Sequence, residues 1–188
     1  MPLTKIQSLG ITDGTIVNAD INASAAIAGT KLSGAGKVLQ VVSTTKTDYL
    51  AISATTTFTD ITGLSVSITP SSVSNKILIL GNVACGGNGS GRLAFRLVKD
   101  STAISIGDTA GSRPRATVGT TSGLSANDQI NASFNFLDSP ATTSSTTYKV
   151  QYIAEVVGAI NGSQGNLDAN SVGNSRTVST ITVMEIAA

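Results

Sequence analysis

Apolar and polar side chains alternate over four segments of this chain, and each segment is long enough to form a β-strand. The alternating apolar residues are Leu64, Val66 and Ile68; Leu93, Phe95 and Leu97; Ile130, Ala132, Phe134 and Phe136; and Tyr148, Val150, Tyr152, Ala154 and Val156. Successive side chains of an extended strand point to opposite faces of a sheet. The pattern therefore predicts sheets with one face packed in a core and the other face in water.

Eight strands are predicted in the part of the chain that follows Gly36. They cover residues 37–43, 57–69, 76–84, 92–99, 103–106, 129–137, 146–157 and 176–186. No helical apolar pattern separates them, and Pro70, Pro114 and Pro140 fall in the connections, where a missing backbone N–H weakens no strand pair. We therefore expect an all-β domain over residues 37–188, either an antiparallel β-sandwich or a jelly-roll-like fold.

The first 36 residues follow a different pattern. Their large aliphatic residues recur about every five positions, which is neither the helical period nor the strand period. These residues are Ile6, Ile11, Ile16, Ile21, Ile27 and Leu32. A segment with so few apolar residues cannot build a core of its own, so residues 1–36 are predicted to be a short extended stalk. In a homotrimer, Ile11, Ile16, Ile21, Ile27 and Leu32 would form its axial apolar seam. The alternative is a flexible leader whose spacing is accidental.

Charge is low and nearly balanced along the whole chain. The formal net charge is +1, from 12 Lys and Arg against 11 Asp and Glu. Such a weak field does not favour binding to nucleic acid or to an anionic membrane. The N-terminal sequence has no apolar run of signal-peptide length, and no apolar run could cross a bilayer. The sequence predicts a protein made in the cytoplasm without membrane insertion.

The sequence contains no histidine, and its one cysteine is Cys85. Histidine is the usual general base of hydrolytic triads and the commonest ligand of transition metals, so Ser-His-Asp and Cys-His sites are excluded. Cys85 is expected to be a buried packing residue. The glycine-rich run at residues 86–91 fits a hairpin loop better than a phosphate-binding loop, because no Lys-Ser/Thr and no helix start follow it. The chain is predicted to lack catalytic, cofactor and metal sites, and so not to be an enzyme.

Positive charge is concentrated at two places. Arg113-Pro114-Arg115 lies in a predicted loop, where recognition residues are often found, and Arg113 and Arg115 are the candidates for receptor contact. Arg92 and Arg96 share one face of a predicted strand, opposite its apolar residues. For Arg92 and Arg96 we favour a solvated strand face, and the alternative is an anion or polysaccharide contact. For Arg113 and Arg115 the alternative to receptor contact is a loop that simply tolerates charge.

Several stretches resemble virion proteins of tailed bacteriophages. Residues 11–32 are similar to a segment that recurs in phage tail-fibre proteins. Other stretches resemble a domain of virion proteins from phages of cyanobacteria and other environmental bacteria; they are residues 36–42, 58–70, 75–79, 95–97, 107–108, 136–140, 147–151 and 179–186. This resemblance implies a homotrimer whose N-terminal segment attaches to other virion proteins of the tail, baseplate or capsid, and whose β-domain points outward.

Three functions follow from these observations. The first is a trimeric tail fibre or spike whose exposed domains attach to the host surface, where polysaccharide is the expected partner. The second is a capsid decoration or head-fibre protein without receptor binding. The third is a polysaccharide depolymerase, since glycoside hydrolysis needs only two carboxylates. No sequence motif selects such a carboxylate pair.

Overall fold

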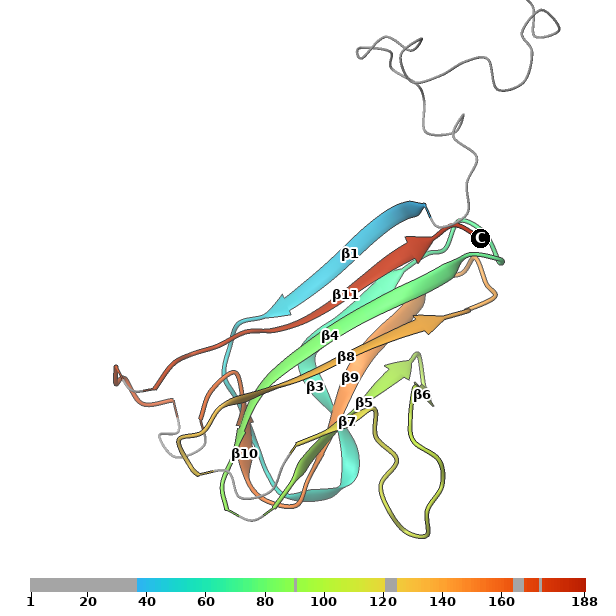
Figure 1. Ribbon diagram of the computed structural model, residues 1–188. Helices are drawn as coiled ribbons and strands as arrows, with labels where there is room; N and C mark the ends of the chain where they lie inside the picture. Colours follow the sequence, from blue (N-terminus) through green and yellow to red (C-terminus); the bar gives the residue numbers. More distant parts are fainter. Residues whose placement is uncertain (1–36, 90, 121–124, 164–167, 173) are drawn as a thin grey trace, which may run out of the picture. The chain divides into compact units, whose positions relative to one another are not determined.

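The computed structural model describes residues 37–89, 91–120, 125–163, 168–172 and 174–188. None of these residues is helical, and they form two antiparallel sheets that pack face to face (Figure 1). The predicted all-β fold and its antiparallel β-sandwich are confirmed. Residues 1–36, with the predicted apolar seam from Ile11 to Leu32, lie outside the described residues, so the stalk remains a prediction.

The first sheet contains six strands. Its order is β1-β11-β4-β10-β2, and β8 pairs with the other edge of β4. The strands are β1 (Val38–Lys46), β2 (Leu50–Ile52), β4 (Lys76–Gly87), β8 (Ile130–Asp138), β10 (Gly158–Ile160) and β11 (Ser179–Ile186). Along one edge, β4 pairs first with β11 and then with the short strand β10. Strand β4 is therefore the centre on which this sheet is built.

The second sheet contains five strands in the order β3-β9-β5-β6, with β7 also paired to β5. These strands are β3 (Thr55–Ile68), β5 (Leu93–Lys99), β6 (Thr102–Ile104), β7 (Val118–Gly119) and β9 (Thr146–Ala154). The pairing brings Thr55, Leu93 and Ala154 into one row at one end of the sheet, although they lie far apart in the sequence.

The core lies between the inner faces of the two sheets. Most of its members are alternating apolar residues of the predicted strands, and Phe95, Tyr148 and Ile181 are among the fully buried ones. Ile52 and Ile160 join the core from β2 and β10. Cys85 is buried in the same core, as expected, and burial raises the pKa of its thiol to about 12. Because the thiolate is the reactive form, such a thiol is chemically inert at neutral pH.

The eight predicted strands are present, and the structure adds three short ones. Strands β2, β7 and β10 were not predicted, and β10 takes up the residues just after β9. The predicted loop at residues 86–91 is wrong at its start, because Gly86 and Gly87 continue β4 and pair with β10. A Cβ atom at Gly86 would lie 2.7 Å from the carbonyl oxygen of Asp128, so only glycine allows this close backbone approach.

Asn161 holds together the corner where β10 and β11 meet β4. It is fully buried and has a positive φ of 64°. Its side-chain amide donates to the carbonyl oxygens of Lys46 at 2.8 Å and Asp48 at 3.0 Å, and its Oδ1 accepts from Ser179 Oγ at 2.6 Å. Its backbone N–H donates to Ala84 at 2.9 Å. One side chain thus satisfies backbone groups that the irregular end of the sheet leaves without ladder partners.

Glu185 is a charged residue inside the sandwich, with 1% of its surface exposed. Its carboxylate accepts hydrogen bonds from the amides of Gln40 and Asn75, both at 2.6 Å, and from the N–H and hydroxyl of Ser71 at 2.6 and 2.8 Å. Burial alone would raise the pKa of Glu185, but these donors outweigh it and lower the pKa to about 2. The charge is therefore stabilised by neutral donors from β1 and from the loop after β3.

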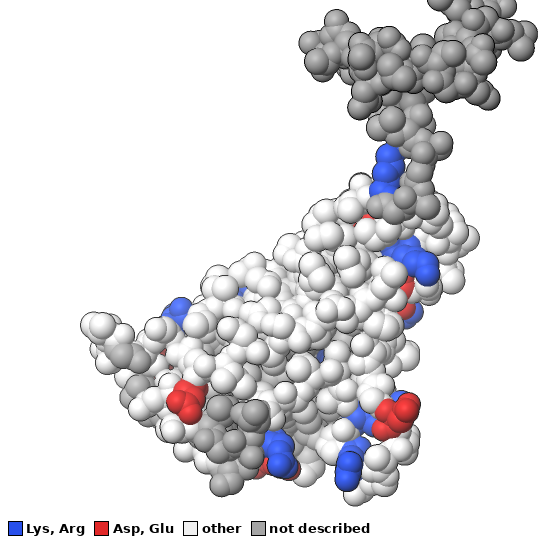
Figure 2. Space-filling model, viewed as in Figure 1, with Lys and Arg blue, Asp and Glu red and all other residues white. Residues whose placement is uncertain are grey.

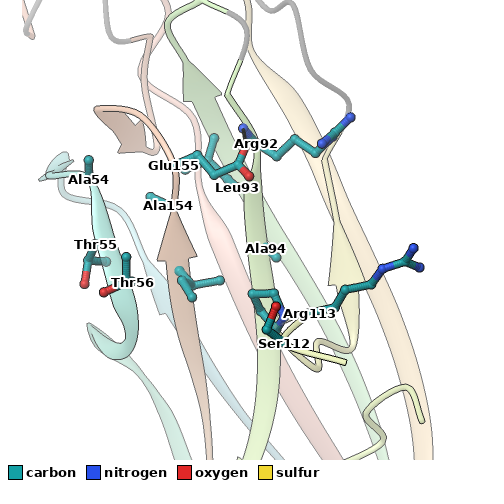
Figure 3. A pocket seen from close by; sticks show the side chains of 12 residues that line it. Ala54, Thr55, Thr56, Arg92, Leu93, Ala94, Ser112, Arg113, Ala154 and Glu155 are labelled. Carbon is teal, nitrogen blue, oxygen red and sulfur yellow. Dashed lines mark hydrogen bonds between the residues drawn. The ribbon is translucent and has the colours of Figure 1, made fainter. Parts of the chain in front are cut away.

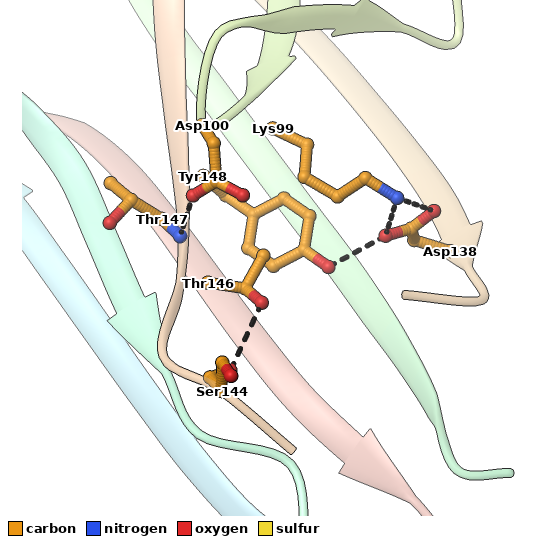
Figure 4. A network of polar contacts seen from close by, with 7 residues as sticks. All are labelled: Lys99, Asp100, Asp138, Ser144, Thr146, Thr147 and Tyr148. Atoms are coloured by element: carbon orange, nitrogen blue, oxygen red, sulfur yellow. Dashed lines mark hydrogen bonds and ion pairs between the residues drawn. The ribbon is translucent and has the colours of Figure 1, made fainter. Parts of the chain in front are cut away.

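A second polar network joins the two sheets (Figure 4). Asp138, at the end of β8 in the first sheet, accepts from the hydroxyl of Tyr148 at 2.7 Å and from Lys99 Nζ at 3.0 and 3.1 Å. Tyr148 and Lys99 belong to β9 and β5 of the second sheet. Burial, followed by the hydrogen bond to Asp138, raises the pKa of Tyr148, so the phenol stays protonated and continues to donate.

Candidate binding site

An open hollow of about 1040 Å³ lies at one end of the second sheet (Figure 3). Four segments line it: the start of β3 with the preceding Ala54, the start of β5, the end of β9, and the loop between β6 and β7. The first three segments meet because β9 pairs with β3 on one side and with β5 on the other. The hollow is thus built on paired strands and closed on one side by a loop.

The floor of the hollow is apolar and its rim is polar. Ala94 and Ile153 are directly paired on the outer face of the sheet and contribute to the floor. The polar lining residues are Thr55, Thr56, Arg92, Ser112, Arg113 and Glu155. A flat apolar floor with hydroxyl, guanidinium and carboxylate groups around it suits a ligand that has one apolar face and several hydroxyl groups.

Arg92 and Glu155 are fixed to each other through the backbone. The N–H of Arg92 donates to Glu155 Oε2 at 3.0 Å, and the N–H of Glu155 donates to the carbonyl oxygen of Arg92 at 3.0 Å. This double link holds the Glu155 carboxylate at the rim while leaving the guanidinium group of Arg92 out of the contact.

Arg113 and Arg92 extend to the same side of the hollow, away from Thr55 and Thr56, in Figure 3. In the part of the chain that the structure describes, neither guanidinium group has a hydrogen bond or an ion pair. Two uncommitted guanidinium groups at one rim can donate several hydrogen bonds to hydroxyl or carboxylate oxygens of a ligand. The structure thus places one of the two predicted receptor-contact residues, Arg113, at the hollow.

Arg115 lies outside the lining of the hollow. Its Nε donates to the carbonyl oxygen of Gly107 at 2.6 Å, and Gly107 N–H donates to Ala116 at 3.2 Å. These bonds close the base of the loop that carries Arg113. A direct receptor contact by Arg115 stays a prediction, whereas its part in holding the loop is visible.

A ladder of polar side chains continues from the hollow along the outer face of the second sheet. Arg96 Nε donates to Gln151 at 2.8 Å, and Gln151 and Lys149 donate to the two oxygens of Asp60 at 2.6 and 2.7 Å. The hydrogen bond from Lys149 lowers the pKa of Asp60. The guanidinium group of Arg96 also lies 4.0 Å from the ring centre of Phe58. Arg96 therefore faces outward, as predicted.

A smaller hollow of about 370 Å³ lies beside the start of β8. It is lined by Ala84, Asn127, Gln129, Ile130, Asn131, Ser175 and Thr177. The Gln129 amide is already bonded to Ser175 at 2.9 Å and accepts from Thr177 at 3.3 Å. Its polar groups are therefore partly committed within the chain, and the larger hollow is the better candidate site.

Within the described residues, no three acidic or cysteine side chains come together in a way that could hold a metal ion. The described part of the chain also has no helix long and apolar enough to cross a membrane.

No protein-family model matches this chain, and no curated protein matches it. Similar solved structures include infectious bursal disease virus Gx strain, with 16% identity and a TM-score of 0.40 over 80% of this chain and 41% of that chain. The VP2 subviral particle of the same virus gives 13% identity and a TM-score of 0.42 over 79% and 41%. This chain thus spans less than half the length of these proteins, and TM-scores of this size do not define a shared fold.

Proposed function

We propose that this chain is a structural protein of a virus particle, a homotrimeric tail fibre or spike whose β-domain attaches to polysaccharide on the host surface. The proposal rests on the sequence resemblance to tailed-phage fibre proteins and on the position of the larger hollow within the domain. No cofactor is part of it.

The hollow lies at the end of the sandwich opposite the point where the chain enters the domain. Strand β3 starts at the hollow with Thr55 and ends at Ile68, near Ser71, which hydrogen-bonds to Glu185. The residue after Glu185, Ile186, pairs with Val38 at the start of the domain. Thr55 and Ile68 pair with Ala154 and Thr146, the two ends of the nine-residue strand β9. The two ends are therefore separated by roughly 25 Å. A domain anchored through the segment before Lys37 would therefore present the hollow away from the anchor. The place of the hollow at the far end of the domain is the observation that carries the proposal.

The polar groups of the hollow are suited to carbohydrate. Thr56 and Ser112 can both donate and accept, and the two arginines can donate to ring hydroxyls or to acidic sugars. The Thr55 hydroxyl already donates to the carbonyl oxygen of Thr57 at 3.0 Å, so it contributes to the hollow as an acceptor. The apolar floor can lie against the C–H face of a sugar ring. Each site is expected to bind weakly, and three tethered copies would gain effective concentration on a repetitive polymer.

We propose binding without hydrolysis. Glu155 is the only carboxylate among the lining residues that the structure describes, and one of its oxygens accepts from the backbone of Arg92. Hydrolysis of a glycosidic bond ordinarily uses two carboxylates that flank it. Appearance of new reducing ends when bacterial capsule is incubated with the protein would contradict this part of the proposal.

Binding can be tested on an array of bacterial surface polysaccharides probed with the full-length chain. Arg113→Ala is expected to weaken binding to any positive glycan about tenfold, because a charge-assisted hydrogen bond is lost. Arg176→Ala removes the same charge from an exposed site before β11, outside the lining of the hollow, and serves as the matched control. Equal binding by Arg113→Ala and wild type would remove the hollow from the proposal.

The place of the protein in a particle needs a separate test. Electron microscopy of virions labelled with an antibody against the β-domain is expected to place the label on tail fibres or spikes. Label spread over the capsid, together with no glycan binding, would instead support a decoration protein without receptor binding.

A further inference from the structure

The outer face of the first sheet carries apolar side chains in a surface that is otherwise hydroxyl and amide. Val41, Met184, Leu78 and Leu137 stand directly opposite one another on β1, β11, β4 and β8. They form one row across four strands, about 14 Å long at the usual strand spacing. Leu80 and Ile186 flank this row on the same face; we call these six residues the apolar face.

The apolar face is open to solvent in the single chain. Val41, Leu137 and Leu80 are exposed by 55%, 49% and 41%, and Met184, Leu78 and Ile186 are partly exposed. Single exposed aliphatic residues are common on protein surfaces, whereas these residues form one contiguous row on a sheet face. Covering the row with another protein surface would remove its apolar area from water, which is favourable.

Charge is nearly absent around the apolar face. On the outward positions of β1, β4, β8 and β11, the one charged residue is Lys76, at the edge of the row. The neighbouring outward residues include Ser43, Thr182, Asn82 and Ser133, which already pair with one another across the strands at 2.8 Å. Figure 2 shows that Lys, Arg, Asp and Glu lie mainly towards the ends of this side, while its middle is uncharged. A surface with an apolar centre and a polar, uncharged border has the composition of a contact between proteins.

The position of β1 indicates which protein covers the apolar face. Strand β1 is the edge strand that carries Val41, and it begins at Val38, directly after the segment whose spaced aliphatics are predicted to join three copies. Copies joined through residues 1–36 would hold their β1 strands close to the common axis. Residues beside a three-fold axis meet their own symmetry mates, so one apolar face is sufficient for self-association.

We infer that the apolar face is the surface through which the β-domains of three copies of this chain meet. This inference rests on the proposed homotrimer and adds the β-domain to the contacts that hold it together. The hollow belongs to the other sheet, so contact through the apolar face leaves it accessible.

The test compares full-length chains by size-exclusion chromatography with light scattering. Wild type is expected at three times 18.9 kDa. Val41→Asp combined with Leu137→Asp places charge at both ends of the row and is expected to lower the mass or to raise the concentration for half-dissociation at least tenfold. Val73→Asp is the control, because Val73 is 61% exposed in the loop before β4, outside the apolar face.

The outcomes separate the inference from the proposed function. A wild-type monomer would overturn the homotrimer itself. A wild-type trimer with a folded double variant of the same mass and the same dissociation would leave the trimer standing and overturn the apolar face as its contact. An unchanged mass and dissociation of the double variant would also be expected if the chain's own N-terminal segment covered the apolar face.

Cross-linking keeps the inference testable if the double variant does not fold. Val41→Cys, treated with a short bismaleimide, is expected to give a species of twice the chain mass in denaturing gels. Wild type and Val73→Cys are the controls, since Cys85 is buried. Absence of cross-linked Val41→Cys in a sample that runs as a trimer would overturn the inference.

Discussion

Glu185 carries a full charge in the sandwich, and the partners that bond to it within the described residues are all neutral. Its partners are two amides, one hydroxyl and one backbone N–H. Neutral donors stabilise a buried carboxylate only when they are held in position. The loop after β3, which supplies Ser71 and Asn75, must therefore be ordered to offset the cost of burying the Glu185 charge.

This arrangement predicts a loss of stability in acid. The folded pKa of Glu185 is lowered from 4.5 to about 2, so its stabilising contribution is present above pH 4.5 and is lost as pH falls towards 2. The contribution is on the order of 3 kcal/mol. Urea unfolding at several pH values should show this decrease. Glu185→Gln should be less stable at neutral pH and should lack the decrease, whereas parallel curves for the two proteins would contradict the assignment.

The position of Asn161 requires both a positive φ and side-chain hydrogen bonds, and two substitutions can separate these requirements. Asn161→Gly keeps the positive φ and loses the side-chain hydrogen bonds, while Asn161→Ala loses the bonds and also strains the backbone. We expect both to lower the free energy of unfolding by about 2 kcal/mol or more, with alanine lower than glycine by about 1 kcal/mol. Thermal or urea unfolding measures the order; equal stability of the two variants would show that φ has no part in it.

At the scale of elements, the sequence predicts the long strands well. Strands β3, β5, β8 and β9 contain enough alternating positions to define a period of two, and the structure confirms them. Strands β2, β7 and β10 have only two or three residues, too few for any period. They form because a longer strand beside them offers free ladder positions, which is a tertiary effect.

Of the candidate site, only the two arginines stand out in the sequence. Arg113 and Arg92 were singled out from the sequence as local concentrations of charge. Thr55 and Glu155 were not, because they reach the hollow through the pairing of β3 and β5 with β9, and strand order cannot be read from one sequence. Glu185 and Asn161 gave no periodic signal either, although Asn161-Gly162 is a dipeptide typical of turns.

The contact of Tyr148 with Asp138 gives a prediction about how the two sheets are joined. Tyr148→Phe removes the hydroxyl and leaves Asp138 with Lys99 as its remaining side-chain partner within the described residues. We expect a loss of about 1 to 2 kcal/mol in the free energy of unfolding with little change in the fold. Denaturant unfolding measures the loss, and Tyr152→Phe serves as a control for removing a tyrosine hydroxyl from the same strand. An equal loss in both variants would contradict a special role for the inter-sheet bond.

At the scale of the whole domain, the hollow and the apolar face belong to different sheets, so substitutions in them should act independently. Arg113→Ala is expected to weaken glycan binding without changing the mass in solution. Val41→Asp with Leu137→Asp is expected to keep the affinity of a single site and lose the gain from multivalency. Biosensor measurements at low and high glycan density distinguish these effects. Loss of single-site affinity in the double variant would mean that the two surfaces are coupled.

The bond of 2.8 Å from Ala187 N–H to the carbonyl oxygen of Lys37 brings the entry and the exit of the domain side by side. A reporter or epitope fused after Ala188 would consequently emerge next to Lys37 and, under the proposed function, would compete for room with the partner that holds the N-terminal segment. The loop of residues 105–117 sits at the hollow instead and contributes little to the core. It is the place where a foreign peptide could be displayed, and under the proposed function an exchange of a few of its residues would change the bound glycan without rebuilding the sandwich.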